Sequence, residues 1–203
     1  MSKGISANVG GSYQQAKASY VNVNGTWTKF GGGLSWATVS NTPTGTYTGD
    51  DGHTYAYYLF ESDGTLTVTT AGLLEVLLVG GGGGRPGNLV TPGSGAYLVT
   101  GLHPFDAAPH AVTVGAGGSY SDTKFIGGIS TLGALSTGVA TYGGGGAGTG
   151  SGRCFQSVIT GEPLNVSGNR QYSTPTPTYG GGGGQTKLQN GQPGVVIAKT
   201  RLN

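Results

Sequence analysis

Alternating apolar and polar residues mark several β-strands along the chain. In residues 19–24 (SYVNVN) and 26–30 (TWTKF) the two classes alternate on either side of an Asn-Gly turn, which is the strongest short signal for a β-hairpin. Residues 54–61 (TYAYYLFE) and 65–70 (TLTVTT) flank a Ser-Asp-Gly turn. The leucine and valine of the second strand face one side and its threonines face the other. No segment keeps a 3.6-residue apolar period, so the pattern predicts a mostly β protein.

A nearly continuous apolar run occupies residues 73–79 (LLEVLLV). Apolar residues on both faces of a strand indicate that both faces are covered, and with the two preceding strands this run predicts a three-stranded meander. Shorter strand candidates follow at residues 96–101, 110–118 and 138–142, and residues 194–202 (GVVIAKTRL) predict a last strand.

Three runs of glycine interrupt this strand pattern. The runs are Gly80, Gly81, Gly82, Gly83 and Gly84, then Gly143, Gly144, Gly145 and Gly146, then Gly180, Gly181, Gly182, Gly183 and Gly184. Flexible linkers are one interpretation, and a phosphate-binding loop is excluded because GGGGGRPG lacks the required Lys-Ser/Thr pair. Because apolar or aromatic residues bracket the runs, we favour ordered polyglycine. In that arrangement extended three-fold helices pack side by side and hydrogen-bond through their backbones.

The predicted fold is therefore a small antiparallel sheet or sandwich followed by a glycine-rich domain with packed polyglycine-II-like segments. We divide the chain into an N-terminal attachment hairpin (residues 1–33), a connector rich in Thr, Ser, Gly and Pro (residues 34–53) and a glycine-rich β domain (residues 54–203).

Composition narrows the function. The 44 glycines among 203 residues exceed the usual share of roughly 7%, while charged residues make up only 9% and the net charge is +2. So little positive charge argues against a nucleic-acid or anionic-membrane partner. No apolar stretch approaches the roughly 20 residues of a membrane helix, and the first 15 residues lack an apolar signal core. We expect no nucleic acid partner, no membrane insertion and synthesis in a cytoplasm.

The few chemically active residues form no persuasive site. Cys154 is the single cysteine, which excludes an internal disulfide framework and a cysteine zinc cluster. His53, His103 and His110 are the only histidines, and the last two flank Asp106; loop histidines explain them better than a metal or acid–base site. The acidic residues are too dispersed to mark paired glycosidase carboxylates. We predict no enzyme, with no catalytic residue, cofactor or metal.

Five motifs follow one another along the chain: FESDGTLTV (residues 60–68), AG (71–72), LEVLLV running into glycines (74–84), AVTVGAGG (111–118) and GVVI (194–197). Their order resembles the glycine-rich domain of bacteriophage tail proteins. Separately, YVNVNGTWTKF in the N-terminal part resembles a hairpin of minor tail proteins from phages of actinobacteria. HPFDAAPH (residues 103–110) stands where the glycine-rich family usually has a shorter turn.

The resemblance implies a virion structural protein of a tail tip or fibre, made in the host cytoplasm and located in the virion tail, with a role in host-surface attachment. A capsid decoration or head-fibre protein is the alternative, and an envelope-degrading enzyme is a weaker one. The partners expected are other virion proteins, further copies of the chain (a trimer is favoured) and a host envelope glycan.

Four residues are candidates for these contacts. Trp27 is the candidate assembly contact because tryptophan is enriched at interface hot spots, although packing on its own hairpin explains it almost as well. Arg153, Arg170 and Tyr172 are candidate receptor contacts. They lie in segments 150–170 and 171–178, which we expect to form loops between the glycine runs, and recognition residues concentrate on loops held by a rigid scaffold.

Overall fold

The computed structural model describes residues 35–84, 96–119, 126–139, 155–167, 178–182 and 190–202, together with the backbone of four strands before residue 32. These four strands form two antiparallel hairpins, β1 (Ser6–Val9) with β2 (Ser12–Gln15) and β3 (Ala18–Val23) with β4 (Thr26–Gly31). In the second hairpin Val23 pairs with Thr26, so the predicted hairpin is confirmed. The described residues contain no helix, and the predicted mostly β class is confirmed.

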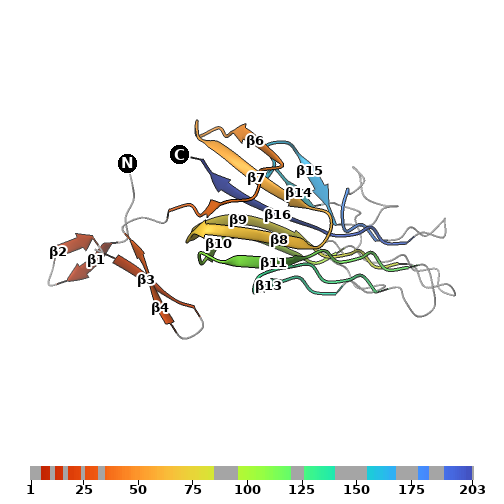
Figure 1. The fold of residues 1–203 in the computed structure, drawn as a ribbon, viewed down its shortest axis with the longest axis horizontal. Coiled ribbons are helices and arrows are strands. Elements are labelled where there is room, and N and C mark those ends of the chain that lie inside the picture. Colours follow the sequence, from red (N-terminus) through yellow and green to blue (C-terminus); the bar gives the residue numbers. More distant parts are fainter. Residues whose placement is uncertain are drawn as a thin grey trace.

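Two five-stranded antiparallel sheets make up the main body (Figure 1). The first sheet, in the order β10-β9-β16-β7-β6, contains β6 (Gly45–Thr48), β7 (Thr54–Phe60), β9 (Gly72–Val79), β10 (Leu98–Phe105) and β16 (Val195–Arg201). The second sheet, in the order β13-β12-β11-β8-β5, contains β5 (Thr38–Val39), β8 (Gly64–Thr70), β11 (Pro109–Thr113), β12 (Thr131–Leu132) and β13 (Leu135–Ser136). A separate hairpin joins β14 (Phe155–Ser157) to β15 (Leu164–Val166).

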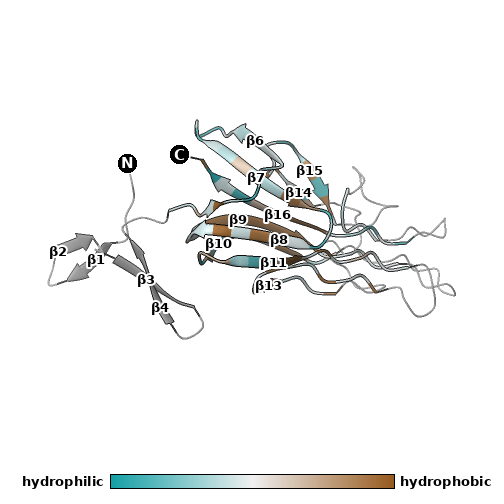
Figure 2. Cartoon of the chain, in the orientation of Figure 1, coloured by the Kyte–Doolittle hydropathy of each residue, from teal (hydrophilic) through white to brown (hydrophobic). Residues whose placement is uncertain are grey.

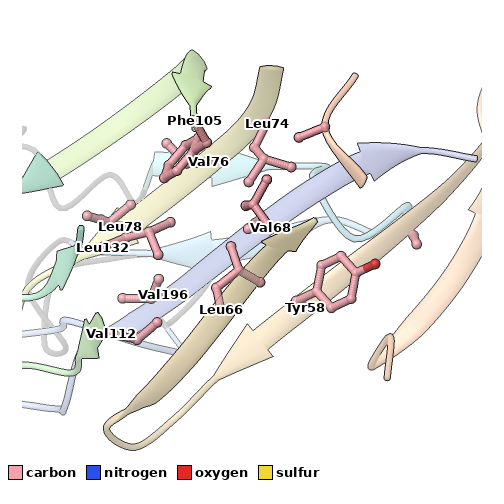
Figure 3. Packing of buried hydrophobic residues seen from close by; sticks show 13 residues of the cluster. Tyr58, Leu66, Val68, Leu74, Val76, Leu78, Phe105, Val112, Leu132 and Val196 are labelled. Atoms are coloured by element: carbon pink, nitrogen blue, oxygen red, sulfur yellow. The ribbon is translucent and has the colours of Figure 1, made fainter. Parts of the chain in front are cut away.

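The main core lies between the two sheets. Leu66 and Val68 of β8 point into it, while the neighbouring threonines 65 and 69 are exposed, as the alternation predicts. Leu74, Val76 and Leu78 of β9 enter the same cluster from the first sheet (Figure 3). Burial of these side chains is the dominant stabilising contribution, at about 2 kcal/mol for each one.

A second core covers the opposite face of the first sheet. Leu77 and Val79 of β9 and Ile197 of β16 pack there against Ile159 and Val166 of the β14–β15 hairpin. The strand LLEVLLV is therefore buried on both faces, as its composition predicts. We refer to this opposite face as the outer face of the first sheet.

The predicted meander is wrong. Strand β7 pairs with β6 and β16, whereas β8 pairs with β5 and β11 in the other sheet. The connection between β7 and β8 thus crosses from one sheet to the other. Strands β7, β9 and β16 carry apolar residues on both faces and join the sheet that is covered on both sides, whereas β8 has one apolar face and joins the sheet with an open side.

The segment expected to be a connector adds strands to both sheets. Strand β5 pairs with β8, and β6 pairs with β7. Between them, the Asn41 side chain donates to the Thr65 carbonyl at 2.8 Å and accepts from the Thr67 N–H at 2.7 Å. Two strand predictions need adjustment: the one at 110–118 ends at Thr113, and the described part of 138–142 is not a strand.

Candidate functional site: the glycine bundle

Five glycine-containing segments continue from the sheets at one end of the sandwich (Figure 1). They are residues 80–84 after β9, 115–119 after β11, 126–128 before β12, 180–182, and 190–194 before β16. Backbone hydrogen bonds join these segments directly, so we refer to them together as the glycine bundle. A flexible linker would make no such bonds, and the linker interpretation is wrong for these residues.

Consecutive amides of the first run reach three different neighbours. The N–H of Gly80 donates to the Tyr97 carbonyl at 3.1 Å, that of Gly81 to Gly128 at 2.8 Å, and that of Gly82 to Gln192 at 2.9 Å. In a β-strand the successive groups alternate between two sides. A chain with three residues per turn directs them in three directions, which is the pattern seen here.

A repeat of three residues also appears between segments. The N–H of Gly194 donates to the Gly115 carbonyl and the N–H of Gly191 donates to the Gly118 carbonyl, each at 2.8 Å. Within the segment 115–119, Gly115 and Gly118 are buried and Ala116 is exposed. Side-by-side packing is therefore observed. The polyglycine-II-like helix stays a prediction, which this three-residue repeat supports.

The packing leaves no room for side chains. A Cβ built on Gly81 would lie 1.9 Å from the carbonyl oxygen of Ala116, and one built on Gly191 would lie 1.9 Å from that of Gly82. Such atoms are covalently bound backbone that cannot move aside alone. The glycine content of these segments is thus a requirement of close backbone approach, and it explains why an apolar strand runs directly into glycines.

Ser130 joins the bundle to the sandwich. Its buried hydroxyl donates to the Val79 carbonyl at 2.7 Å and accepts from the Gly115 N–H at 2.9 Å, while its own N–H donates to the Thr137 hydroxyl at 2.9 Å. One side chain therefore supplies partners where β9 and β11 end and the glycine segments begin, which satisfies backbone groups that burial would otherwise leave without partners.

Tyr179 fixes the segment that leads into Gly180. Its ring packs against the second core, and its hydroxyl donates to Glu61 Oε1 at 2.6 Å. Burial and this hydrogen bond raise the pKa of Tyr179 to about 12. Nearby, buried Ser167 adopts a positive φ of 59° and donates through its hydroxyl to the Ala96 carbonyl at 2.7 Å.

The structure describes only some of the predicted site residues. Residues 80–84 and 180–182 belong to the bundle, whereas Gly143, Gly144, Gly145, Gly146, Gly183 and Gly184 lie outside the described residues. The backbone of Trp27 pairs with Asn22 in the β3–β4 hairpin, and its side chain lies outside the description.

The receptor candidates Arg153, Arg170 and Tyr172 also lie outside the described residues. The predicted loop at 150–170 is wrong in its middle, because residues 155–166 form the β14–β15 hairpin and pack on the first sheet. Sequence reasoning missed segment 190–194 as a bundle member. Its signal was the pair of glycines, Gly191 and Gly194, three residues apart.

Titratable groups near the β10–β11 connection form a small local cluster. His110 Nε2 lies 3.3 Å from Asp106 Oδ1, and the ring meets Phe105 edge-on at 5.0 Å between centroids. In the part of the chain that the structure describes, no three or more His, Cys, Asp or Glu side chains are grouped so as to hold a metal ion. The same part contains no helix that is long and apolar enough to cross a membrane.

No protein-family model, curated protein or solved structure matches the chain. The function has to be inferred from the sequence motifs, the sandwich and the glycine bundle.

Proposed function

We propose that this chain is a virion structural protein of a bacteriophage tail tip or fibre that contributes to attachment at the host surface. The observation that carries the proposal is the glycine bundle, in which backbone segments continue the strands of a sandwich without side chains between them. The motif order described above, from residue 60 to residue 197, supports the same assignment by resemblance.

The bundle suits a structural element that projects from an assembly. Hydrogen bonds run between segments that are far apart in sequence, as between Gly82 and Gln192 or Gly118 and Gly191, so movement of one segment requires its neighbours to move. Several bonds of about 1 kcal/mol each, made together, hold such a scaffold stiff. Loops on a stiff scaffold are suited to recognition, and the predicted contacts Arg153, Arg170 and Tyr172 belong to this part of the proposal.

Assembly with other virion proteins and with further copies of the chain, most simply as a trimer, completes the proposal. The β3–β4 hairpin, with Trp27 on β4, is the proposed attachment element. Replacing Trp27 with Ala should leave the unfolding transition of the sandwich unchanged and reduce incorporation into particles. Normal incorporation of this variant would contradict the role of Trp27.

Labelling of intact particles tests the location. An antibody raised against the purified chain, detected with gold in electron micrographs, should mark the tail tip of the phage that encodes it. Gold over the head would favour a capsid decoration or head-fibre protein instead. Particles without any label, in a preparation where the antibody detects the purified chain, would contradict a virion role.

A further inference from the structure

The β14–β15 hairpin covers part of the outer face of the first sheet, and its turn reaches Tyr47, since a Cβ on Gly161 would lie 2.6 Å from the Tyr47 ring. Near the glycine bundle the hairpin packs on apolar residues. Farther from the bundle one row of paired residues crosses all five strands: Leu102, Glu75, Lys199, Tyr57 and Gly45. The hydropathy of β16 changes accordingly from apolar to polar along its length (Figure 2).

Aromatic rings form the next row toward the same end. Tyr47 stacks on Tyr55 with ring centroids 5.6 Å apart, and Trp36 meets Tyr55 edge-on at 5.7 Å. Tyr55 contacts both rings and is buried, whereas Trp36, Tyr47 and Tyr57 are partly exposed. We call Trp36, Tyr47, Tyr55, Tyr57, Glu75 and Lys199 the aromatic face.

The charges on this face are paired. Lys199 is only 9% exposed, its Nζ lies 2.5 Å from Glu75 Oε2, and it sits 4.8 Å from the ring centroid of Tyr55. Beside the face, Asp51 accepts a hydrogen bond from the Tyr55 hydroxyl at 2.6 Å, and Arg201 lies opposite Tyr55 in the strand register. Two positive and two negative side chains give no net attraction for an ionic ligand, so the face is suited to a neutral one.

Three polar groups on this face make no hydrogen bond to another described residue: the indole N–H of Trp36 and the hydroxyls of Tyr47 and Tyr57. Flat apolar rings with polar tips suit ligands that have one apolar surface and a rim of hydroxyls. A pyranose ring has this form: its C–H groups stack on an aromatic ring and its hydroxyls hydrogen-bond at the edge.

We propose that the aromatic face binds a neutral saccharide, with Trp36 as the stacking surface and Tyr57 and Glu75 as hydrogen-bonding groups. This site lies at the end of the sandwich opposite the glycine bundle. The inference names a ligand class for the proposed attachment function and rests on that function only for the biological source of the sugar.

Fluorescence of one tryptophan tests the site directly. The chain has two tryptophans, so Trp27→Phe leaves Trp36 as the only one in the full-length protein. Titration with glucose, galactose and N-acetylglucosamine should change the Trp36 emission saturably for at least one sugar, with a Kd of about 1 mM. No saturable change with any of the three would overturn the proposal.

A pair of matched variants locates the binding. In the Trp27→Phe background, Tyr57→Phe removes a hydroxyl that has no described protein partner and should weaken binding at least about fivefold, the effect of one lost hydrogen bond. Tyr97→Phe makes the same chemical change at an exposed tyrosine beside the bundle and should leave the affinity unchanged. Equal affinities for the two variants would place the sugar elsewhere and overturn the proposal.

Titration with an anionic sugar tests whether the site prefers neutral ligands. Galacturonate should bind no more tightly than galactose, and tighter binding would contradict the neutral-ligand inference.

The outcome of the sugar titrations is independent of the particle labelling. Gold at the tail with no sugar binding would reject this site and leave the structural role, whereas sugar binding with gold at the head would keep the site and reject the tail assignment.

Discussion

Gly82 faces the backbone of Gly181 so closely that a Cβ on Gly82 would lie 2.2 Å from the Gly181 carbonyl oxygen. Even the smallest side chain must therefore push two segments of the bundle apart. We expect Gly82→Ala to lower the free energy of unfolding by about 3 kcal/mol and Gly82→Val to lower it further. Urea unfolding followed by tyrosine fluorescence measures the change.

Gly64→Ala is the matched control for this substitution. Gly64 is exposed, and its added Cβ would meet the movable ring of Phe60 at 3.2 Å. A change of less than about 1 kcal/mol is expected there. Equal midpoints for Gly82→Val and the unaltered protein would show that the run tolerates side chains and is not packed in solution.

Hydrogen exchange distinguishes ordered glycine from linker glycine. The amides of Gly82, Gly118 and Gly191 donate to backbone carbonyls of other segments, so they should exchange about as slowly as amides in the centre of β9. The Gly117 N–H, in the same segment as Gly118, makes no hydrogen bond to a described residue and should exchange faster. NMR-detected exchange resolves these amides; uniformly fast exchange in all four would contradict the bundle.

Removal of one hydroxyl should weaken the junction between sandwich and bundle. In Ser130→Ala the buried Val79 carbonyl and Gly115 N–H both lose their side-chain partner. We expect a loss of about 2 to 4 kcal/mol from two unsatisfied buried groups. Ser136→Ala is the control, because its exposed hydroxyl donates only to the neighbouring Thr137 carbonyl, at 3.1 Å. It should change stability by less than about 0.5 kcal/mol, and equal effects of the two substitutions would contradict the junction role.

Alkaline pH should loosen the contact between Tyr179 and Glu61. Folding raises the pKa of Tyr179 from 10.0 to about 12, so the folded state holds this proton more tightly than the unfolded state. The stabilisation is complete below pH 10 and is lost as the pH rises toward about 12. Solvent screening of this partly exposed group limits the loss to about 1 kcal/mol.

Comparison of two variants isolates that contribution. Tyr55 also has a pKa raised to about 12, by its hydrogen bond to Asp51 and by burial, so the unaltered protein should lose stability in the same window for two reasons. Tyr179→Phe should show a shallower decline between about pH 10 and pH 12 than Tyr97→Phe, in urea unfolding at each pH. Parallel declines in the two variants would reject the role of Tyr179.

The sequence predicted which face of each strand is buried better than it predicted which strands pair. Period-two alternation in β8 and apolarity on both sides of β9 follow from the residues themselves, and burial confirmed both. The choice of neighbouring strand depends on contacts between distant segments, so proximity in sequence suggested a meander that does not form. The pairing of β16 with β7 and β9 has no local signal.

Bundle segments with consecutive glycines were predictable from the sequence, whereas the segment with separated glycines was not. In segment 190–194 only Gly191 and Gly194 meet neighbouring carbonyl oxygens at distances that exclude a side chain, and Gln192 and Pro193 fill the positions between them. A three-residue spacing of glycine is therefore the more general signal. The aromatic face was not predictable, because Trp36, Glu75 and Lys199 come from distant parts of the chain.

The position of β16 also has a consequence for the order of synthesis. This strand lies between β7 and β9 in the first sheet, yet it follows every other described strand in the chain. Until β16 is synthesised, β7 and β9 each have one unpaired edge and the bundle lacks segment 190–194. A chain released before β16 is made would therefore keep two unpaired strand edges in the first sheet, and exposed edges promote aggregation.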